Sequence, residues 1–494
     1  MKLYTIYTES HKEMYKNYFL KTLPNEFEVI ANEIPQECPT GEFYESGWDK
    51  TCYRKIELYL KAAEENIGEA FVFSDVDIQF FGKIKDTLLE ELGDFDIACQ
   101  NDTGPYYCSG FFICRGNERT INMFREMLKN YDKEDQTTLN NHIHLSKSKF
   151  LSHKFFTIGH LLNTTWVGQE FEIQSEILIH HSNWVVGIEN KIKLMDIVRE
   201  KNDNMLSKIQ DQINQHFSNW RPNPEYPTYP PYHEGLYLED RFYELFKERN
   251  IISNRFYIPI FWTTCYCDNK IHGLQEAISR LNPNMKYFTL AQHDDAIREA
   301  LPPDTICFNA GGNGGGIPIP LVCSPIKEEY KKNVERDIFC SFVGSVTHPI
   351  RSRIFDVLKK IDKYHFSNRN WTSSIPKEDF DRFLDIASRS IFSLCPRGYG
   401  RSSFRLYEVM QLGSIPVFVY DEKWTPFEEE IDWNEFSVLI HSNDIDKIDD
   451  ILSLYTDERI KKMQSNLDKY WKENFTMERI FERIINKLNY RKDS

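Results

Sequence analysis

The N-terminal part of the chain alternates between short apolar runs and longer stretches with a helical spacing of apolar residues. Apolar and polar residues alternate along residues 2–8, and residues 70–74 and 95–100 form two further short, mainly apolar runs. Residues 50–66 and 84–94 instead show the apolar spacing of an amphipathic helix. Strands that alternate with helices in this way predict a parallel sheet with crossover helices.

A change of character near the middle of the chain predicts a domain boundary. Residues 195–217 have the pattern of an amphipathic helix, and residues 221–231 then contain five prolines in eleven positions. A segment so rich in proline cannot form a regular helix or a central strand. We therefore expect one domain in residues 1–215 and a second in residues 216–494.

The second domain carries two series of strand patterns. The first series comprises residues 255–264, 286–294 and 305–318, and the second comprises residues 337–346, 390–396, 413–421 and 436–442. Helical patterns separate the members of each series, so the sequence predicts two α/β lobes, at about 225–334 and 335–494. The predicted fold class of the whole chain is α/β, without internal repeats.

Composition and charge narrow the possible functions. The chain has 494 residues, of which 41% are hydrophobic and 27% are charged, and its formal net charge is −15. This composition is that of a globular protein, and the negative charge argues against a nucleic-acid partner or a membrane surface. The 11 cysteines have no regular spacing, which favours buried free thiols in a reducing compartment. Without a signal peptide or an apolar run of about 18 residues, we expect a cytoplasmic protein with no membrane span.

Two acidic residues stand at the end of a predicted buried strand. Asp75 and Asp77 follow the apolar run 70–74, separated only by Val76. Open α/β sheets bind ligands at the carboxyl ends of their strands, and a period of two places both carboxylates on one face. Carboxylates suit Mg²⁺ or Mn²⁺, which are often shared with substrate phosphates. The alternative is a pair of turn residues that end the strand.

Three further segments share an order and spacing with a known family. Together with residues 59–82, the segments 106–120, 135–143 and 179–191 resemble the nucleotide-diphospho-sugar transferases of the A-type glycosyltransferase fold, a single Rossmann-like domain. The resemblance covers about residues 1–200. In it, the small residues Ser109 and Gly110 let the acceptor region close on the site, and Asp135 and Gln136 open a later helix.

The resemblance implies roles for particular residues of this domain. It implies Mn²⁺ or Mg²⁺ held by Asp75, Asp77 and His181, with His180 as a competing ligand. Asp75 is also implied to hold the ribose or a metal-bound water. The other residues implied to face the donor are Thr8 in the nucleotide pocket, Gly187 and Lys191 at the diphosphate, and Lys50, Arg54 or Lys55 as balancing charges. For these last three, a solvated basic face is an equal alternative.

Residues 391–440 carry the most specific pattern of the chain. An apolar strand, Pro-x-Gly, Ser-x-x-Arg, Glu, Gly-x-Ile-Pro-Val, Pro-Phe and Asp-Trp follow one another in this segment. The segment closely resembles the exostosin-type glycosyltransferases, whose B-type fold has two facing Rossmann-like lobes. Residues 342–358 fit the same family, and the resemblance implies no metal in this domain.

The exostosin resemblance implies a second donor site. Gly344 and Ser345 would let backbone amides approach a diphosphate at a helix start. Arg405 would bind phosphate oxygens with its planar guanidinium, and Glu408, on the same helix face, would hold ribose hydroxyls. Arg397 and Arg401 would add positive charge. The alternative for Arg405 and Glu408 is a surface ion pair.

An inverting transfer also needs a base near the acceptor hydroxyl. Candidates in the upstream lobe are His293, Asp295 and Glu239, although each also fits a structural role. The glycine-rich segment 309–320 lacks the Gly-Lys-Ser/Thr of a phosphate-binding P-loop. We interpret it as a turn beside the cleft between the lobes.

These observations predict a dual glycosyltransferase. Nucleotide-sugar donors, with UDP as the expected carrier, would supply sugars to successive positions of an oligosaccharide or glycoconjugate acceptor. The resemblances suggest retention in the first domain and inversion in the second. Two alternatives stay open: one active domain with an acceptor-holding partner domain, or a carbohydrate-binding scaffold with decayed sites. The oligomeric state is not predicted.

Overall fold

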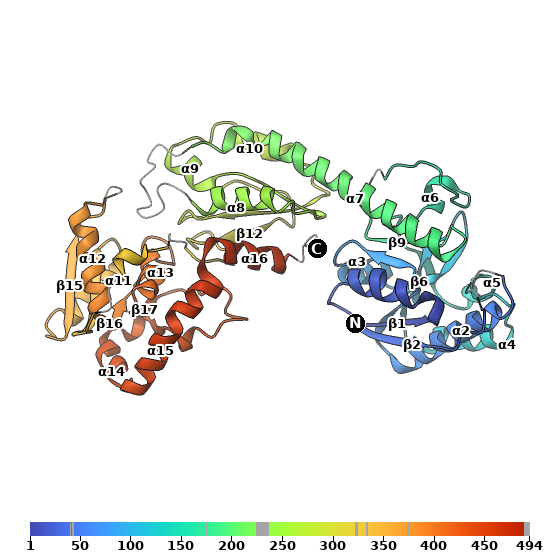
Figure 1. Ribbon diagram of the computed structural model, residues 1–494, viewed down its shortest axis with the longest axis horizontal. Helices are drawn as coiled ribbons and strands as arrows, with labels where there is room; N and C mark the ends of the chain where they lie inside the picture. The colour runs from blue at the N-terminus through green and yellow to red at the C-terminus, as the bar shows by residue number, and fades with distance from the viewer. Residues whose placement is uncertain are drawn as a thin grey trace. The chain divides into compact units, whose positions relative to one another are not determined.

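The computed structural model describes residues 1–39, 41, 44–173, 175–223, 237–321, 325–331, 334–372 and 375–488. These residues form two compact units, and each is described by itself. The first contains residues 1–208 and 252–254, and the second contains residues 209–251 and 255–494. Helix α7 (Ile188–His216) begins in the first unit and ends in the second (Figure 1). The predicted functional division at residue 215 stays a prediction, and most of the proline-rich segment 221–231 lies outside the described residues.

A six-stranded mixed sheet forms the centre of the first unit. Its strand order is β2-β1-β3-β6-β5-β7. The strands are β1 (Lys2–Tyr7), β2 (Glu28–Glu33), β3 (Ala70–Ser74), β5 (Ile97–Asn101), β6 (Tyr107–Arg115) and β7 (Ser148–Phe150). β6 is antiparallel to β3 and β5, whereas the other pairs are parallel. The predicted parallel arrangement does not extend to β6, because the connection from β5 is too short for a crossover helix.

A small second sheet brings distant parts of the first unit together. It contains β4 (Ile78–Phe80), β9 (Ile179–His181) and β8 (Phe155–Thr157), in that order. β4 and β9 are antiparallel, and Ile78 pairs with His181. This register places the end of β9 beside the turn that follows β3.

Helices cover both faces of the large sheet. α2, α4 and α5 lie on one side and α3 on the other (Figure 1). Because successive side chains point to opposite faces of a strand, Phe71 and Phe73 pack with α2 while Val72 packs with α3. The helices of this unit are α1 (Lys12–Met14), α2 (Trp48–Glu65), α3 (Lys85–Leu92), α4 (Glu118–Lys129), α5 (Asp135–His142) and α6 (Gly159–Leu162).

Two parallel sheets form the second unit, so the predicted α/β class with two lobes is confirmed. The first has the order β10-β11-β12-β13 and the second β15-β14-β16-β17-β18. Their strands are β10 (Arg255–Tyr257), β11 (Lys286–Ala291), β12 (Ile306–Asn309), β13 (Ile317–Pro318), β14 (Ile338–Ser345), β15 (Tyr364–Arg369), β16 (Ser390–Leu394), β17 (Ile415–Tyr420) and β18 (Val438–His441). The strand expected over 255–264 is shorter than predicted: Pro259 cannot donate to a ladder, and residues 262–267 are helical.

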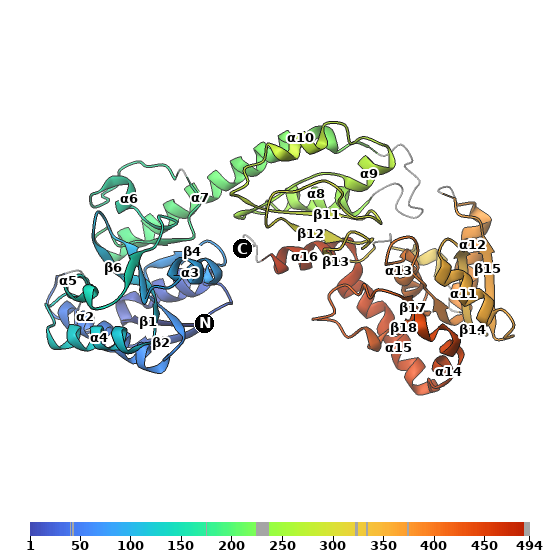
Figure 2. The ribbon, with the colours of Figure 1, turned by 180° about the vertical axis from the view of Figure 1, so that it is seen from behind.

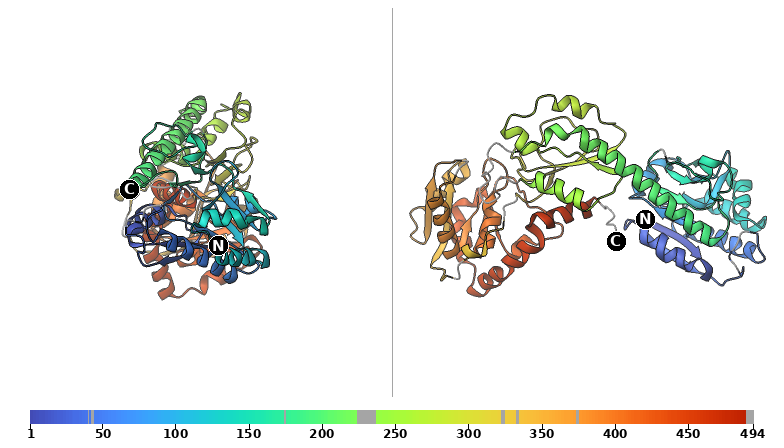
Figure 3. Two further views of the ribbon diagram at one scale, coloured as in Figure 1. Left: turned by 90° about the vertical axis from the view of Figure 1, so that its right-hand side faces the viewer. Right: turned by 45° about the horizontal axis from the view of Figure 1, so that its top comes forward.

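The C-terminal helix returns to the upstream lobe. α16 packs against α8, with the rings of Phe242 and Phe481 4.9 Å apart (Figures 1 and 2). The helices of this unit are α8 (Leu238–Glu248), α9 (Trp262–Cys267), α10 (Leu274–Ser279), α11 (Pro349–Leu358), α12 (Lys377–Arg389), α13 (Phe404–Gln411), α14 (Ile448–Ser453), α15 (Asp457–Tyr470) and α16 (Met477–Lys487). α15 and α16 follow one another at the end of the chain (Figure 3).

Two chain-wide features complete the fold. The cysteines among the described residues are free thiols, and most of them are buried. Within the same described ranges, no helix combines the length and the apolar character needed to cross a bilayer.

Candidate functional site

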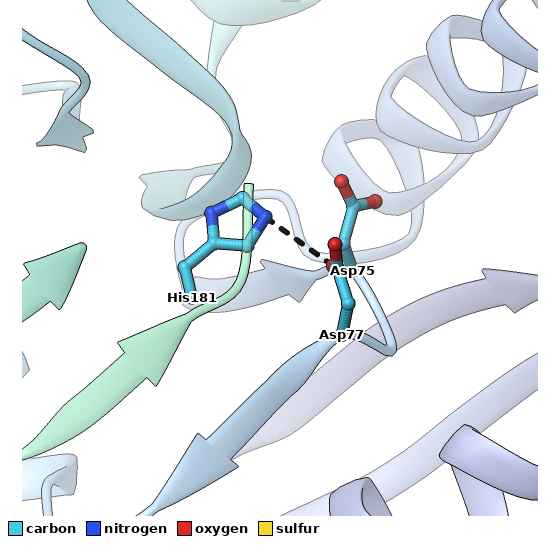
Figure 4. Close-up of side chains that lie close together, drawn as sticks. All are labelled: Asp75, Asp77 and His181. Carbon is cyan, nitrogen blue, oxygen red and sulfur yellow. Dashed lines mark ion pairs between the residues drawn. The ribbon is translucent and has the colours of Figure 1, made fainter. Parts of the chain in front are cut away.

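Asp75, Asp77 and His181 converge in the first unit. Asp75 follows β3, Asp77 precedes β4, and His181 ends β9 (Figure 4). One ligand atom from each lies within 4.8 Å of the others. The backbone N–H of Ser182 donates to the Asp77 carbonyl at 2.9 Å, which holds β9 beside the acidic turn. The structure therefore brings together the three residues predicted as metal ligands.

A neighbouring amide fixes the orientation of the His181 ring. Gln100 Nε2 donates to the backbone carbonyls of Phe155 and Phe156, at 3.1 Å each. With the amide held in this way, Gln100 Oε1 can only accept, so His181 Nδ1 donates to it, at 2.8 Å. The other ring nitrogen, Nε2, lies 3.3 Å from Asp77 Oδ1 (Figure 4). Burial lowers the pKa of His181, but Asp77 outweighs it and raises this pKa to about 10, so Nε2 carries a proton that a metal ion would replace.

His180 lies on the opposite side of β9. It is fully buried, its Nδ1 is 3.2 Å from Gln79 Nε2, and its ring packs near Phe156. Consecutive residues of a strand point to opposite faces. The structure thus places His181, and not its neighbour, in the cluster.

Two lysines balance the charge of the buried acids. Lys191 Nζ lies 2.6 Å from Asp77 Oδ2, and Lys55 Nζ lies 2.9 Å from Asp75 Oδ2 and 2.7 Å from Asp135 Oδ2. Burial would raise the pKa of Asp77, but Lys191 and His181 outweigh it and hold this pKa well below its ordinary value. For Asp75, burial prevails over Lys55 and raises the pKa. Lys55 is bound to two carboxylates, which leaves Lys191 nearer the open side of the site.

The cluster lines a cavity of about 470 Å³, within the usual size of ligand sites. The predicted donor-facing residues Thr8, Lys55, Asp75 and Lys191 all line it. Lys50 and Arg54 are outside this lining and pair with nearby glutamates. The lining also includes His11, Trp48 and Trp184, which were not singled out from the sequence as site residues.

Gly110 leaves room for the cluster. A Cβ atom at this position would lie 2.7 Å from Asp75 Oδ2 and would also collide with the His181 ring. The Asp75 backbone N–H donates to the Gly110 carbonyl at 2.7 Å. β6 therefore passes so close to the cluster that only glycine fits there.

A second cavity, of about 440 Å³, lies in the second unit. The predicted residues Gly344, Ser345, Arg405 and Glu408 line it. Arg397 does not: it donates to Asp421 at 2.7 Å and to Asn313 and the Tyr399 carbonyl. Arg401 also lies outside the lining, where it pairs with Glu422 beside Trp424.

Arginine side chains line this second cavity, among them Arg369 and Arg405. Within the described part of the chain, the buried Nη1 atoms of Arg405 and Arg369 have no hydrogen-bond partner. Arg405 Nη1 is 3.4 Å from Glu408 Oε2, and its guanidinium lies over the Phe383 ring. Burial raises the pKa of Glu408 although both arginines oppose the shift. Guanidinium groups bind phosphate oxygens, so the arginines of this lining suit an anionic ligand.

The three predicted bases do not line this cavity. Asp295 pairs with Arg298 at 2.6 Å, and His293 Nδ1 accepts from the Asp295 backbone at 3.2 Å. Glu239 is fully buried and accepts hydrogen bonds from Thr263 and Gln292. Their catalytic roles stay predictions. Asp294, which the sequence pattern did not single out, lines the cavity.

Comparison with protein families gives two matches. Residues 13–195 match the model of the nucleotide-diphospho-sugar transferases, and residues 310–454 match the model of the exostosin GT47 domain. The first range includes the Asp75, Asp77 and His181 cluster. The second includes most of the lining of the second cavity.

Similar curated proteins align with limited parts of the chain. A probable glucuronoxylan glucuronosyltransferase (IRX7) of Arabidopsis thaliana is 28% identical over 158 residues, which cover 30% of this chain and 35% of the relative. An exostosin-1 homolog of Caenorhabditis elegans is 30% identical over 122 residues, covering 22% of this chain and 32% of the relative. The chain thus spans about a third of the length of these relatives.

Solved structures also resemble part of the chain. A glycosyltransferase involved in glycosylation of the major capsid of PBCV-1 is 11% identical with a TM-score of 0.28, and the match covers 40% of this chain and 98% of that one. The galactosyltransferase LgtC, in complex with donor and acceptor sugar analogs, is 11% identical with a TM-score of 0.25, covering 37% and 86%. Scores this low support no conclusion about the present chain.

Proposed function

Because the chain carries an N-terminal nucleotide-diphospho-sugar transferase domain and a C-terminal exostosin GT47 domain, we propose that the protein is a bifunctional glycosyltransferase. Each cavity binds one nucleotide-sugar donor, with UDP as the carrier. The two sugars are transferred to successive positions of an oligosaccharide or glycoconjugate acceptor. The observation that carries the proposal is the convergence of Asp75, Asp77 and His181 in a cavity of ligand size.

A divalent cation suits the donor set of the first cavity. Two carboxylates and an imidazole with its Nε2 directed at them are ligands for Mn²⁺ or Mg²⁺. When bound, the ion neutralises charge that develops on the departing nucleoside diphosphate. Gln100 supports this assignment, because its hydrogen bond keeps a proton on Nδ1, so Nε2 is the nitrogen that loses its proton when an ion binds.

The residues around the cluster orient the donor. Lys191 reaches Asp77 from the start of α7 and carries a positive charge toward the diphosphate side. Lys55 holds Asp75 and Asp135 in place. Thr8, at the end of β1, contributes to the nucleotide pocket. Gly110 keeps the space between the acids and the histidine open.

The second cavity binds its donor with arginines and backbone amides. Arg405 and Arg369, which line the cavity, bind the diphosphate, and Gly344 and Ser345 end β14 at the edge of the cavity. Glu408 is placed to accept hydrogen bonds from the ribose. Guanidinium groups bind phosphate oxygens in a planar, bidentate manner. The sugar transfer in this second cavity is proposed to need no metal ion.

The names of the relatives suggest the first donor to test. Two of the curated relatives are named as probable glucuronosyltransferases. UDP-glucuronate is therefore the proposed donor of the second cavity. The cytoplasmic location of the protein stays a prediction.

Donor turnover by the full-length protein tests the proposal. A panel of UDP- and GDP-sugars is assayed with Mn²⁺ or with EDTA, using wild type, Asp77→Asn and Arg405→Ala. Asp77→Asn should abolish the Mn²⁺-dependent turnover alone, and Arg405→Ala the EDTA-resistant turnover alone. Asp86→Asn, an exposed residue of α3, is the matched control.

The alternatives predict different results. If one cavity turns over no donor while the other is active, the silent domain holds the acceptor and the protein is not bifunctional. If neither cavity turns over a donor but the protein binds an oligosaccharide, the protein is a carbohydrate-binding scaffold.

A further inference from the structure

The upstream lobe presents one acidic side chain to the second cavity. Asp294 follows β11, whereas nearly all other residues of the lining come from the downstream lobe. Among the described residues of the lining, the carboxylates are those of Asp294 and Glu408. Glu408 faces Arg405 on its own helix, so Asp294 is the carboxylate without a paired arginine in the lining of this cavity.

The glycine-rich segment holds the backbone of Asp294. A Cβ atom at Gly311 would lie 2.7 Å from the Asp294 nitrogen and would also collide with its Cα. The Asn313 backbone N–H donates to the Asp294 carbonyl at 3.0 Å. The close approach of residues 311–313 thus requires glycine, and it fixes where the Asp294 side chain begins.

Gly400 holds the carboxylate itself. Its backbone N–H donates to the Asp294 side chain. A Cβ atom at Gly400 would contact Asp294 Oδ1 and would lie 2.7 Å from the Gly311 carbonyl. Two glycines from separate segments, one in each lobe, therefore enclose one carboxylate at the cavity wall.

The surroundings tune the proton affinity of Asp294. Burial, followed by the charge of Asp295, raises its pKa to about 6. The Gly400 N–H, Arg351 and Arg397 oppose this rise. A carboxylate with a pKa close to the working pH is both ionised and basic enough to accept a proton.

The neighbouring acidic residues and His293 already have other hydrogen-bond or ion-pair partners, or are buried in the core. Asp295 pairs with Arg298, and His293 Nδ1 accepts from the backbone. Glu239 is enclosed in the core. None of the three lines the cavity.

We propose that Asp294 is the catalytic base of the second cavity. This inference rests on the proposed function of that cavity. The acceptor hydroxyl oxygen forms a bond to the anomeric carbon of the donor while its proton passes to the Asp294 carboxylate. The bond between the anomeric carbon and the diphosphate oxygen breaks, and its electron pair leaves with the nucleoside diphosphate. Arg405 and Arg369 receive that negative charge, so no other reactant is needed.

The full-length Asp294→Asn variant tests this role, in an Asp77→Asn background that silences the first cavity. The probe is UDP-glucuronate, or the panel donor that the background protein turns over fastest in EDTA, with water as acceptor. We expect kcat to fall by about 10²–10⁴-fold, the range for loss of a general base. Binding of UDP should stay within about threefold, since Asp294 is not one of the residues proposed to bind the diphosphate. Asp356→Asn, exposed on α11, controls for the loss of a surface charge.

The pH profile adds a second readout. With Asp294 present, the rate should fall as the pH drops below about 6, because the protonated carboxyl cannot accept a proton. In Asp294→Asn the residual rate should lack this limb. Gly400→Ala, which displaces the carboxylate without removing it, should also lower kcat and keep UDP binding.

Other results overturn the assignment. If kcat is unchanged in Asp294→Asn, Asp294 is not the catalytic base. The same conclusion follows if Asp295→Asn lowers kcat equally, and in both cases the proposed function still holds. Loss of UDP binding in Asp294→Asn would make the residue structural. If the background protein turns over no donor at all, the proposed function of the cavity fails first.

Discussion

His181 and Gln100 are joined by a 2.8 Å hydrogen bond that sets the tautomer of the imidazole. Gln100 is buried in β5 and reaches no part of the cavity, so it acts only through the histidine. Its amide cannot rotate freely, because two backbone carbonyls of β8 hold its Nε2. Such outer partners orient metal ligands and raise their basicity.

Replacing Gln100 by leucine should therefore weaken Mn²⁺ binding by about 10–100-fold, the usual effect of losing an outer-shell partner. The measurement is a calorimetric titration of the full-length protein with MnCl₂. Gln136→Leu, at the start of α5, is the matched control, since Gln136 donates to Asp102 and not to the cluster. Unchanged Mn²⁺ affinity in the Gln100 variant would show that the tautomer is set without the amide.

The positions of the ligands were predictable to different degrees. Asp75 and Asp77 follow a short apolar run, so sequence alone puts them at the end of a strand. His181 was chosen over His180 from the resemblance of its segment, and the pairing of β4 with β9 gives the physical reason, because it brings His181 beside the acids. Gln100 has no sequence signal, because a residue that acts through another carries no motif of its own.

The fold, like the site, was predicted from the sequence only in part. In the first unit, periodicity predicted β1, β3 and β5 but not β6, whose antiparallel direction depends on the length of the loop after β5. In the second unit, His293, Asp294 and Asp295 stand in a row after β11. Which of them meets the cavity depends on the glycines that pack against the turn. Contacts between distant segments of this kind leave no local pattern.

Asp96 should give the first unit a pH-dependent stability. Its carboxylate accepts hydrogen bonds from Arg119, the Lys147 backbone and Asn117, with Arg119 the largest influence, and its pKa is lowered to about 2. The unfolded value is about 3.9. The stabilisation is therefore fully present above pH ~4 and is lost as the pH falls toward ~2.

Asp96→Asn should accordingly lower the free energy of unfolding by about 2 kcal/mol at pH 7, and the difference from wild type should vanish near pH 2. Differential scanning calorimetry across this range measures it. Asp94→Asn, exposed two residues earlier, is the control. A difference that persists unchanged to pH 2 would mean that the carboxylate charge contributes nothing.

Arg405→Lys separates charge from geometry in the second cavity. Lysine keeps the charge but loses the planar guanidinium, so UDP affinity in EDTA should fall by about tenfold, and by about 100-fold in Arg405→Ala. Isothermal titration with UDP gives both values. Arg389→Ala, on α12 and paired with exposed Asp337, should bind UDP as wild type does. Equal affinity of the lysine variant and wild type would show that the cavity needs only a positive charge.

Gly110→Ala should close the metal site without disturbing the strand that carries it. The backbone of β6 is extended at this position, so alanine is compatible with the strand itself. The added methyl group, however, meets the His181 ring and lies 2.7 Å from Asp75 Oδ2. We expect loss of Mn²⁺ binding and of Mn²⁺-dependent donor turnover, with the EDTA-resistant turnover of the second cavity unchanged.

Gly104→Asn is the control, because asparagine tolerates the positive φ of that residue and nothing lies within 4 Å of its Cβ. If Gly110→Ala binds Mn²⁺ as wild type does, the ion must sit away from the space between Asp75 and His181, and the proposed ligand set would have to change.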